Sequence, residues 1–369
     1  MRRAIAGAMA AAGREPADPG LRPTGEPGQY ASNVAFACGE PPGPVAARIA
    51  AFLTGAPLGD ASCIGARHIA RAEVTGPGFI TVTVPIEALT DLPERIAVAG
   101  PACVASDALR GLTVLVPPPG DPLALSSWEE ARAALAAQLT ASLAAAAGAT
   151  LPLPCDDERS RGVVLAENDP ELAEHDREAA AAVAFAGPDA VRFSLARALP
   201  GRPVLLDPLT IARHSPGNPA YAVRYAHARA ASQLRWAAIS RETSPCGFPR
   251  WPAGPISLPS IGSAGHRTGG YGGSPSREAR SPSREATALL DALSWLPERV
   301  ATAARRGRPD EFARYLEELA SATIAALICP GDPGSSGAHG TDRLRLARAA
   351  RTGLAAGLGL LGVSAPDRL

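Results

Sequence analysis

The stretch NPAYAVRYAHARAASQLR, residues 218–235, holds two tyrosines, one histidine and three arginines in a chain otherwise rich in alanine, proline and glycine. Aromatic rings and guanidinium planes stack on unpaired bases, and the same side chains hydrogen-bond base edges. At helical spacing these side chains lie on one face of a helix and on the two faces next to it. The candidate RNA-contacting residues of this stretch are Tyr221, Arg224, Tyr225, His227, Arg229 and Arg235. In the competing interpretation the tyrosines are half-buried core residues and the arginines are solvated.

The charge balance limits which partners are expected. The 36 basic and 36 acidic residues of the 369-residue chain cancel. A chain without net positive charge lacks the global field of a general nucleic-acid binder, so RNA contact must be local and a DNA partner is not expected. The sequence contains no lysine, so every basic residue is an arginine. Chemistry that needs a lysine ammonium is therefore excluded from this chain.

Cysteine usage and hydropathy point to a cytoplasmic protein. The six cysteines form no CxxC pair and no histidine stands at metal-ligand spacing, so neither a disulfide framework nor a metal site is expected. The start MRRAIAGAMAAAG has too weak an apolar stretch for a signal peptide. Residues 133–155 are uncharged but mostly alanine, which favours a packed helix over a membrane span.

Local patterns predict an α+β unit near the start of the chain and a strand followed by a helix after it. Residues 46–53 have helical periodicity, and residues 69–84 read as two short strands around the breaker Gly76-Pro77-Gly78. TVLVP (113–117) predicts a buried strand, followed by a Pro/Gly turn and an alanine-rich helix that reaches about residue 150. A further strand is predicted at 162–167.

The second half of the chain is predicted to be helical, apart from one long insertion. Apolar residues recur at three- and four-residue spacing in the segments 187–199, 219–240, 286–305, 309–328 and 342–361. The tract 241–285 is rich in Gly, Pro and Ser and contains SPSREAR followed at once by SPSREAT. Such a composition cannot form a core, and we expect it to be disordered.

Several of these motifs resemble bacterial arginyl-tRNA synthetases, and most closely the truncated, synthetase-related anticodon-binding proteins with a DALR domain. GQYASNVAF (28–36) and IARAEVTGPGFITVTV (69–84) resemble the N-terminal additional domain, which in that family touches the tRNA elbow. The segments similar to the family's C-terminal helical domain are 187–198, 218–235, 289–300, 308–320 and 344–369. The resemblance implies tRNA as the partner.

The resemblance weakens where the family has its catalytic residues. PPPGDPLALSSWEEARAALAAQL (117–139) resembles the first turn and helix of the catalytic domain, but Ala124, Leu125, Ser126 and Ser127 occupy the positions of its HIGH-type signature. No KMSKS-type loop precedes Gly187. A βαβ unit takes roughly 30 residues, so residues 111–186 are too few for the two nucleotide-binding halves of the family. We expect no catalytic residue and no ATP, metal or other cofactor.

Three further positions qualify the comparison with the family. DAVR (189–192) matches the name-giving DALR pattern, but Asp189 and Arg192 are expected to cap and brace a helix start rather than to touch a ligand. Thr81 stands where the family usually has an asparagine, and Leu369 where it commonly ends in methionine. Both are retained as candidate RNA contacts, with altered chemistry.

Together the sequence predicts three parts: an α+β N-terminal domain (1–100), a degenerate strand-helix remnant of a Rossmann-type catalytic domain (101–186), and an all-α DALR anticodon-binding helical bundle (187–369). The expected function is tRNA binding without catalysis. An active arginine-tRNA ligase and a module that binds a protein partner stay open as alternatives.

Overall fold

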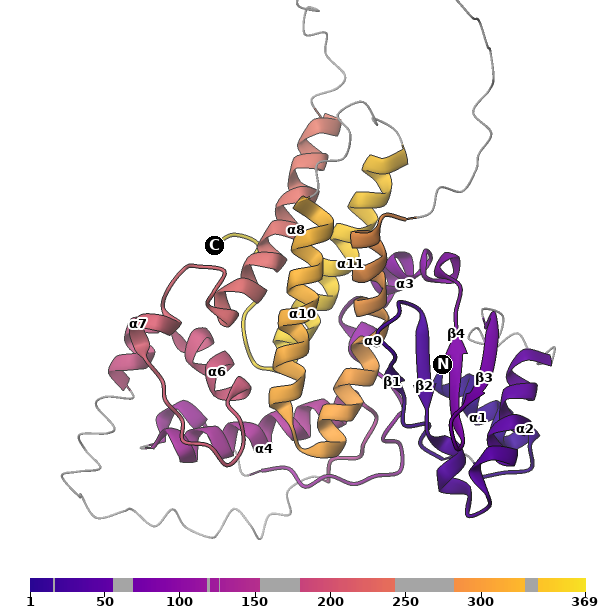
Figure 1. The fold of residues 1–369 in the computed structure, drawn as a ribbon. Helices are drawn as coiled ribbons and strands as arrows, with labels where there is room; N and C mark the ends of the chain where they lie inside the picture. Colours follow the sequence, from indigo (N-terminus) through magenta and orange to yellow (C-terminus); the bar gives the residue numbers. More distant parts are fainter. Residues whose placement is uncertain are drawn as a thin grey trace, which may run out of the picture.

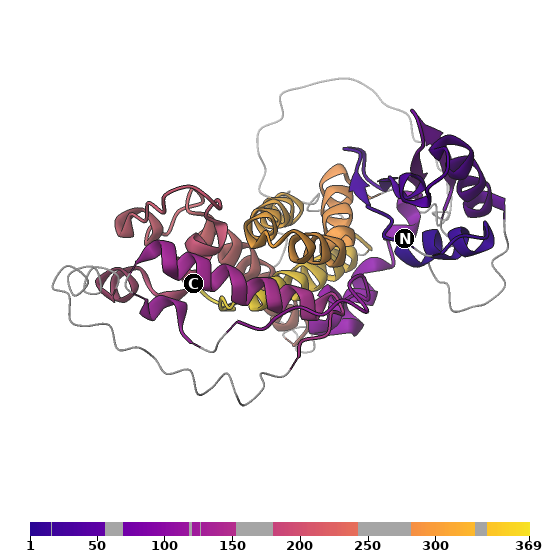
Figure 2. The ribbon, with the colours of Figure 1, turned by 90° about the horizontal axis from the view of Figure 1, so that it is seen from below.

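The computed structural model describes residues 1–15, 17–55, 69–117, 120–125, 127–152, 180–242, 282–328 and 338–369. The predicted strand 162–167 and nearly all of the tract 241–285 lie outside these residues. An α+β N-terminal domain lies at one side of a helical bundle, and helices α6 and α7 lie at the other side, as both views show (Figures 1 and 2).

The N-terminal domain is a small antiparallel sheet backed by helices. Its elements are α1 (Arg2–Ala11), β1 (Arg22–Pro23), β2 (Gln29–Ser32), η1 (Val34–Cys38), α2 (Pro42–Gly55), β3 (Arg71–Thr75) and β4 (Phe79–Thr83). The strand order is β1-β2-β4-β3, and all neighbours are antiparallel. Ile80 and Val82 of β4 are fully buried on the face against which α2 packs. The predicted pair of strands is confirmed: Gly76 and Gly78 turn the chain between them at positive φ.

Short helices follow the sheet and lead into the bundle. They are η3 (Ile86–Leu89), α3 (Leu92–Ala99) and η4 (Gly100–Val104). Both α3 and η4 contact α9 (Arg284–Arg306) and α11 (Ala338–Leu360). Helix α3, which falls within the predicted N-terminal domain, therefore packs against the helical bundle.

The remaining elements form the helical domain. They are η5 (Pro122–Ala124), α4 (Trp128–Ala146), α6 (Pro188–Arg197), α7 (Pro208–Ile211), α8 (Pro219–Glu242), α9, α10 (Pro309–Ile328) and α11. Helix α10 contacts α8 and α9, and α11 contacts α8. Phe193, Phe312 and Leu296 are fully buried among these helices, each contributing about 1.5–3 kcal/mol through removal from water. The five helices predicted from periodicity are confirmed.

Local signals fix the ends of α9. The Ser283 hydroxyl accepts a hydrogen bond from the Ala286 N–H at the start of the helix, and Gly307 ends it in the left-handed region. Ser283 belongs to the second copy of the SPSRE repeat, so the last residues of the predicted disordered tract begin a helix.

The predicted strand at 113–117 is wrong. Only an isolated parallel bridge between Thr113 and Thr150 forms there, and the Leu115 side chain is 83% exposed. Within the described residues no second strand lies beside this segment, so its backbone has no ladder to join. The predicted helix does form, as α4, but it packs on α9 and α6 and crosses beneath the bundle (Figure 2). The described residues thus do not confirm a Rossmann-type remnant.

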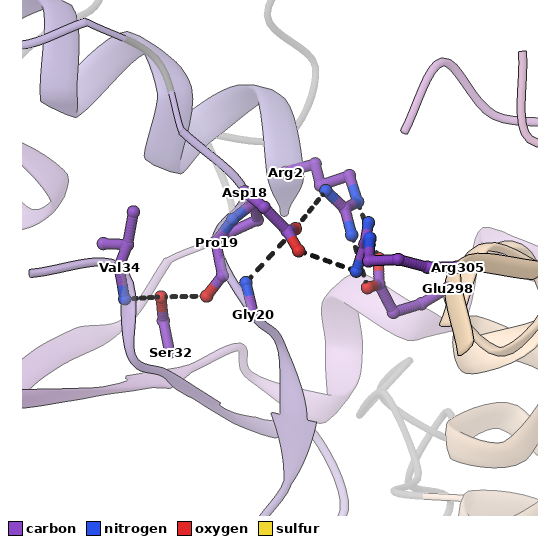
Figure 3. Close-up of polar contacts among 8 residues, drawn as sticks. All are labelled: Arg2, Asp18, Pro19, Gly20, Ser32, Val34, Glu298 and Arg305. Atoms are coloured by element: carbon purple, nitrogen blue, oxygen red, sulfur yellow. Dashed lines mark hydrogen bonds and ion pairs between the residues drawn. The ribbon is translucent and has the colours of Figure 1, made fainter. Parts of the chain in front are cut away.

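A polar network joins the two domains. Arg2 donates from Nε and Nη2 to both carboxylate oxygens of Glu298 on α9, at 2.8 and 2.6 Å, and from Nη1 to Asp18 at 2.7 Å. Asp18 also pairs with Arg305 at 2.6 Å (Figure 3). Nearby, the Tyr30 ring lies 4.8 Å from the Trp295 ring, centroid to centroid. The sheet is therefore docked directly on α9.

Along the described part of the chain, no helix is both long enough and apolar enough to cross a membrane.

Candidate nucleic-acid interface

Three rings stack in a column at the start of α8. The rings of Tyr221 and Tyr225 are 5.7 Å apart at an interplanar angle of 17°, because residues four apart lie one above the other on a helix. The exposed His214 extends the column, 5.3 Å from Tyr221 at 15°. Both tyrosines are partly exposed, a burial that fits the stacking platform and the half-buried core of the competing interpretation equally well. We call His214, Tyr221 and Tyr225 the aromatic column.

The residues before α8 hold this helix start in place. The Asn218 side-chain amide donates to the carbonyls of Ile211 and Arg213 at 2.6 and 2.8 Å, and its Oδ1 accepts from the Ala220 N–H at 3.2 Å. Asn218 is only 5% exposed. The loop that carries His214 is thereby tied to the first turn of α8.

The C-terminal segment, residues 362–369, runs along α8 (Figure 1). Its Ser364 N–H donates to Asp189 at 3.0 Å, and the Ser364 hydroxyl donates to the same carboxylate. Asp189 also pairs with Arg224 of α8 at 3.3 Å. Asp189 does lie in the first turn of α6, but it makes no capping bond there. Its expected place in the first turn, where an acid offsets the helix dipole, is confirmed, and its oxygens bind Ser364 and Arg224 rather than the backbone of α6.

His227 lies beneath the C-terminal segment. Its side chain is 2% exposed, and Nδ1 donates to the Pro366 carbonyl at 3.0 Å. Burial lowers the pKa of His227, although the bond to Pro366 opposes this effect. The ring is therefore a neutral donor that holds the backbone of the segment, and it is not open to a ligand in this arrangement.

Arginines hold the end of the segment. Arg235 donates to the Asp367 carbonyl at 2.8 Å, and Arg351 of α11 binds both carboxylate oxygens of Asp367 at 3.0 and 3.1 Å. Arg351 lowers the pKa of Asp367 through these bonds. Beyond this clamp, Leu369 is 54% exposed. The guanidinium groups of Arg224 and Arg235 are thus partly occupied within the chain.

Arg229 differs from these two arginines. Its Nε is buried without a hydrogen-bond partner in the described structure, as is that of Arg224, but Arg229 forms no ion pair there, whereas Arg224 pairs with Asp189. Of the three predicted arginines of α8, Arg229 has the least engaged charge.

Thr81 lies in a second surface, on the sheet of the N-terminal domain. It sits in β4 between Ala31 of β2 and Glu73 of β3, and its hydroxyl lies 3.3 Å from that of Thr75. Phe79 is on the same face, two residues earlier in the strand. Its ring lies 4.9 Å from that of Phe36, and the two side chains are 40% and 45% exposed. We call Phe36 and Phe79 the phenylalanine pair.

The signature positions of the resembling enzymes have structural roles here. The Ser127 hydroxyl accepts from the Glu130 N–H at 3.2 Å and caps α4. Ala124 ends the short helix η5, which Asp121 caps by accepting from the Leu123 N–H. Arg192 pairs with Asp121 at 3.3 Å, so it braces η5 rather than the start of its own helix. Across the described ranges, no three His, Cys, Asp or Glu side chains are grouped to hold a metal ion.

Sequence reasoning missed three side chains of these surfaces: His214, Phe36 and Phe79. His214 lies four residues before Asn218, and only the fold of that loop brings its ring onto Tyr221. Phe36 and Phe79 come from elements far apart in the sequence. The one available signal was that Phe79 shares the strand face of Thr81, two residues apart.

Comparisons with known proteins found a matching domain model and related sequences. Residues 271–369 match the model of the DALR anticodon binding domain. Curated relatives include the arginine–tRNA ligase of Frankia alni, 33% identical over 187 residues, which are 50% of this chain and 29% of that protein. That of Paenarthrobacter aurescens is 34% identical over 192 residues, or 51% of this chain and 30% of that protein.

The chain is related to the arginyl-tRNA synthetases. It spans about three tenths of the length of these curated relatives. Among solved structures, the Thermus thermophilus arginyl-tRNA synthetase matches with a TM-score of 0.36 and 23% identity, covering 70% of this chain and 40% of that one. The DALR domain match contains α9, α10, α11 and the C-terminal segment, whereas α8 and its aromatic column precede it.

Proposed function

We propose that this chain binds tRNA and does not charge it. The aromatic column carries the proposal, because bases of an anticodon loop are unstacked and are bound by stacking on aromatic side chains. A column of three nearly parallel rings, partly exposed at its tyrosines and exposed at His214, offers such a platform at the start of α8. The matched anticodon binding domain, which follows α8 in the chain, is consistent with this position.

In this proposal the remaining candidates have different roles. Arg229 contacts phosphate, since its charge is the least engaged within the chain. Leu369 makes an apolar contact from the exposed end of the C-terminal segment. Arg224, His227 and Arg235 position that segment through Ser364, Pro366 and Asp367. These three residues therefore contribute mainly by holding the C-terminal segment in place beside the aromatic column.

The sheet of the N-terminal domain is proposed as a second contact. The phenylalanine pair offers a stacking surface, and the Thr81 hydroxyl can hydrogen-bond a base edge. The two surfaces lie at opposite sides of the bundle, so one RNA that touches both must span its width (Figure 1).

Absence of catalysis is proposed from the residues at the signature positions. Ala124 has no polar side-chain atom that could hydrogen-bond a phosphate, and Ser127 is engaged as a helix cap. No lysine is present to stabilise charge on a leaving phosphate. The related ligases favour one competing function, arginine-tRNA ligation by this chain itself.

Two assays separate these functions. Titration of fluorescently labelled tRNA at two salt concentrations should give saturable binding, and Arg229→Ala should lower the salt slope by about 1. The purified chain should show no arginine-dependent exchange of pyrophosphate into ATP and should not charge tRNA. Absence of saturable binding at low salt would refute the tRNA proposal, and arginine-dependent exchange would establish the ligase.

A further inference from the structure

A cleft of about 790 Å³ lies where the N-terminal domain meets α3, η4 and α9, away from both surfaces described above. Ligand sites often occur at domain boundaries, and this volume is within their usual range of roughly 300–1,000 Å³. The cleft borders the network of Figure 3, since Arg2 and Glu298 line it. Their mutual ion pair fixes one wall of the cleft.

One side of the cleft is apolar. Leu89, Leu92 and Ile96 come from η3 and α3, and Leu293 and Trp295 come from α9. Cys103 also lines this region, and burial raises the pKa of its thiol to about 11. The thiol is therefore uncharged near neutral pH, and it adds to the apolar surface rather than to the negative charge.

The charged residues of the lining are more positive than negative. Arg3 and Arg110 reach the same oxygen of Asp107, at 3.4 and 3.8 Å, and their side chains are 74% and 79% exposed. Arg95 also lines the cleft, and among the described residues it pairs with no carboxylate. Asp107 is shared by two guanidinium groups at long distances, and Arg2 takes up the other lining carboxylate, Glu298. Arg3, Arg95 and Arg110 are therefore left able to bind an anion.

Two buried polar atoms of cleft-lining residues, Ser106 Oγ and Trp295 Nε1, lack a hydrogen-bond partner in the described structure. Ser106 is next to Asp107 in the chain, and its buried hydroxyl oxygen makes no hydrogen bond within the described residues. A buried hydroxyl without a partner is destabilising, so a ligand that supplies a donor or acceptor there relieves this cost on binding.

We propose that this cleft binds a nucleoside phosphate. The phosphate lies against Arg3, Arg95 and Arg110, where guanidinium forks match its oxygens. The base and sugar lie against the apolar wall, with a sugar hydroxyl at Ser106. A free nucleotide and a nucleotide within an RNA share this chemistry.

The test uses the full chain and equilibrium dialysis with AMP and UMP, compared with inorganic phosphate. Either nucleotide should bind saturably and at least tenfold more tightly than phosphate, because phosphate alone gains nothing from the apolar wall. The double substitution Arg95→Gln with Arg110→Gln should weaken nucleotide binding at least tenfold. Arg48→Gln, an exposed arginine on α2 that pairs with Glu40, is the matched control and should change nothing.

A second pair of variants fills the cleft. Ala102 is exposed in the cleft lining, so Ala102→Trp should abolish nucleotide binding, whereas Ala10→Trp, at an exposed position of α1 outside the lining, should not. Thermal melting of each variant checks that it is folded. No saturable binding of AMP or UMP, or equal binding by Ala102→Trp, overturns the proposal, as does phosphate binding as tightly as the nucleotides.

Two further measurements identify the source of the ligand and separate this site from tRNA recognition. Displacement of bound AMP by tRNA identifies a nucleotide within RNA as the ligand, and persistence of bound AMP identifies a free nucleotide. Tyr225→Ala should leave AMP binding unchanged, since Tyr225 is not among the residues that line the cleft. Failure of tRNA binding would therefore leave the nucleotide measurement intact.

Discussion

The aromatic column and the phenylalanine pair both expose stacked rings, but they are built in different ways. The two tyrosines of the column are four residues apart on α8, so the helix itself sets their separation. Phe36 and Phe79 belong to η1 and β4, and only the packing of the N-terminal domain brings their rings to 4.9 Å. The column has local support, whereas the pair depends on tertiary structure.

The two surfaces are alike in how they use charge. Arg224 and Arg235 next to the column bind the C-terminal segment, and Arg71 on the sheet forms an ion pair with Glu73. Most nearby guanidinium groups are therefore engaged within the chain, which has no net charge. In the proposed function, stacking rather than phosphate attraction would therefore supply most of the affinity of either surface.

The largest expected effect comes from weakening the junction between the N-terminal domain, which carries the phenylalanine pair, and α9 of the helical bundle. Arg2→Ala leaves Glu298, which is only 12% exposed, without its bidentate partner, and should lower the free energy of unfolding by about 2–3 kcal/mol. Urea unfolding measures this change. The exposed pair Arg48–Glu40 provides the control, because Arg48→Ala should cost less than about 1 kcal/mol. Equal costs for the two substitutions would mean that the junction contributes no more than a surface ion pair.

The next effect tests the column itself. Tyr225→Ala removes one stacking ring and should weaken tRNA binding by about 1–3 kcal/mol in a fluorescence titration. Tyr225→Phe keeps the ring and should bind nearly as the unmodified chain does. If Phe and Ala at this position weaken binding equally, the hydroxyl matters and the stacking interpretation is wrong.

A smaller effect is expected at the phenylalanine pair. Phe79→Ala leaves the Phe36 ring in place, so tRNA binding should weaken by about 1 kcal/mol, at the lower end of the range for one stacking ring. Phe79→Tyr retains the ring and is the matched control. A loss larger than that of Tyr225→Ala would reverse the ranking of the two surfaces.

The smallest effect concerns the pH dependence of the C-terminal segment beside the column. Burial lowers the pKa of His227 from its ordinary 6.5, so the folded chain binds fewer protons than the unfolded chain just below that pH. The stability from neutral His227 is fully present above about pH 6.5 and declines as the pH falls toward the lowered value. Thermal unfolding between pH 5.5 and 7.5 measures this decline.

His227→Gln is the control for that measurement. Glutamine keeps a donor near the Pro366 carbonyl but does not titrate in this range, so the decline should become shallower. An identical pH dependence in both proteins would assign the decline to other groups.

The sequence by itself determined the helices and the hairpin of the sheet. Helical periodicity located the five C-terminal helices, because an apolar stripe at that spacing must face a core. The Gly76-Pro77-Gly78 breaker located the turn between β3 and β4, where positive φ at both glycines is required. Spacing of four residues was also enough to place Tyr221 and Tyr225 on one helix face.

The tertiary structure alone decided which partner each of these elements met. TVLVP has the composition of a strand, but a strand forms only beside another strand, and Leu115 remains exposed. From the sequence, His227 is a candidate RNA contact. In the structure the C-terminal segment covers it, and its Nδ1–H donates to the Pro366 carbonyl. Local spacing encodes the direction of a side chain, whereas its burial and charge depend on residues distant in the chain, which only folding brings together.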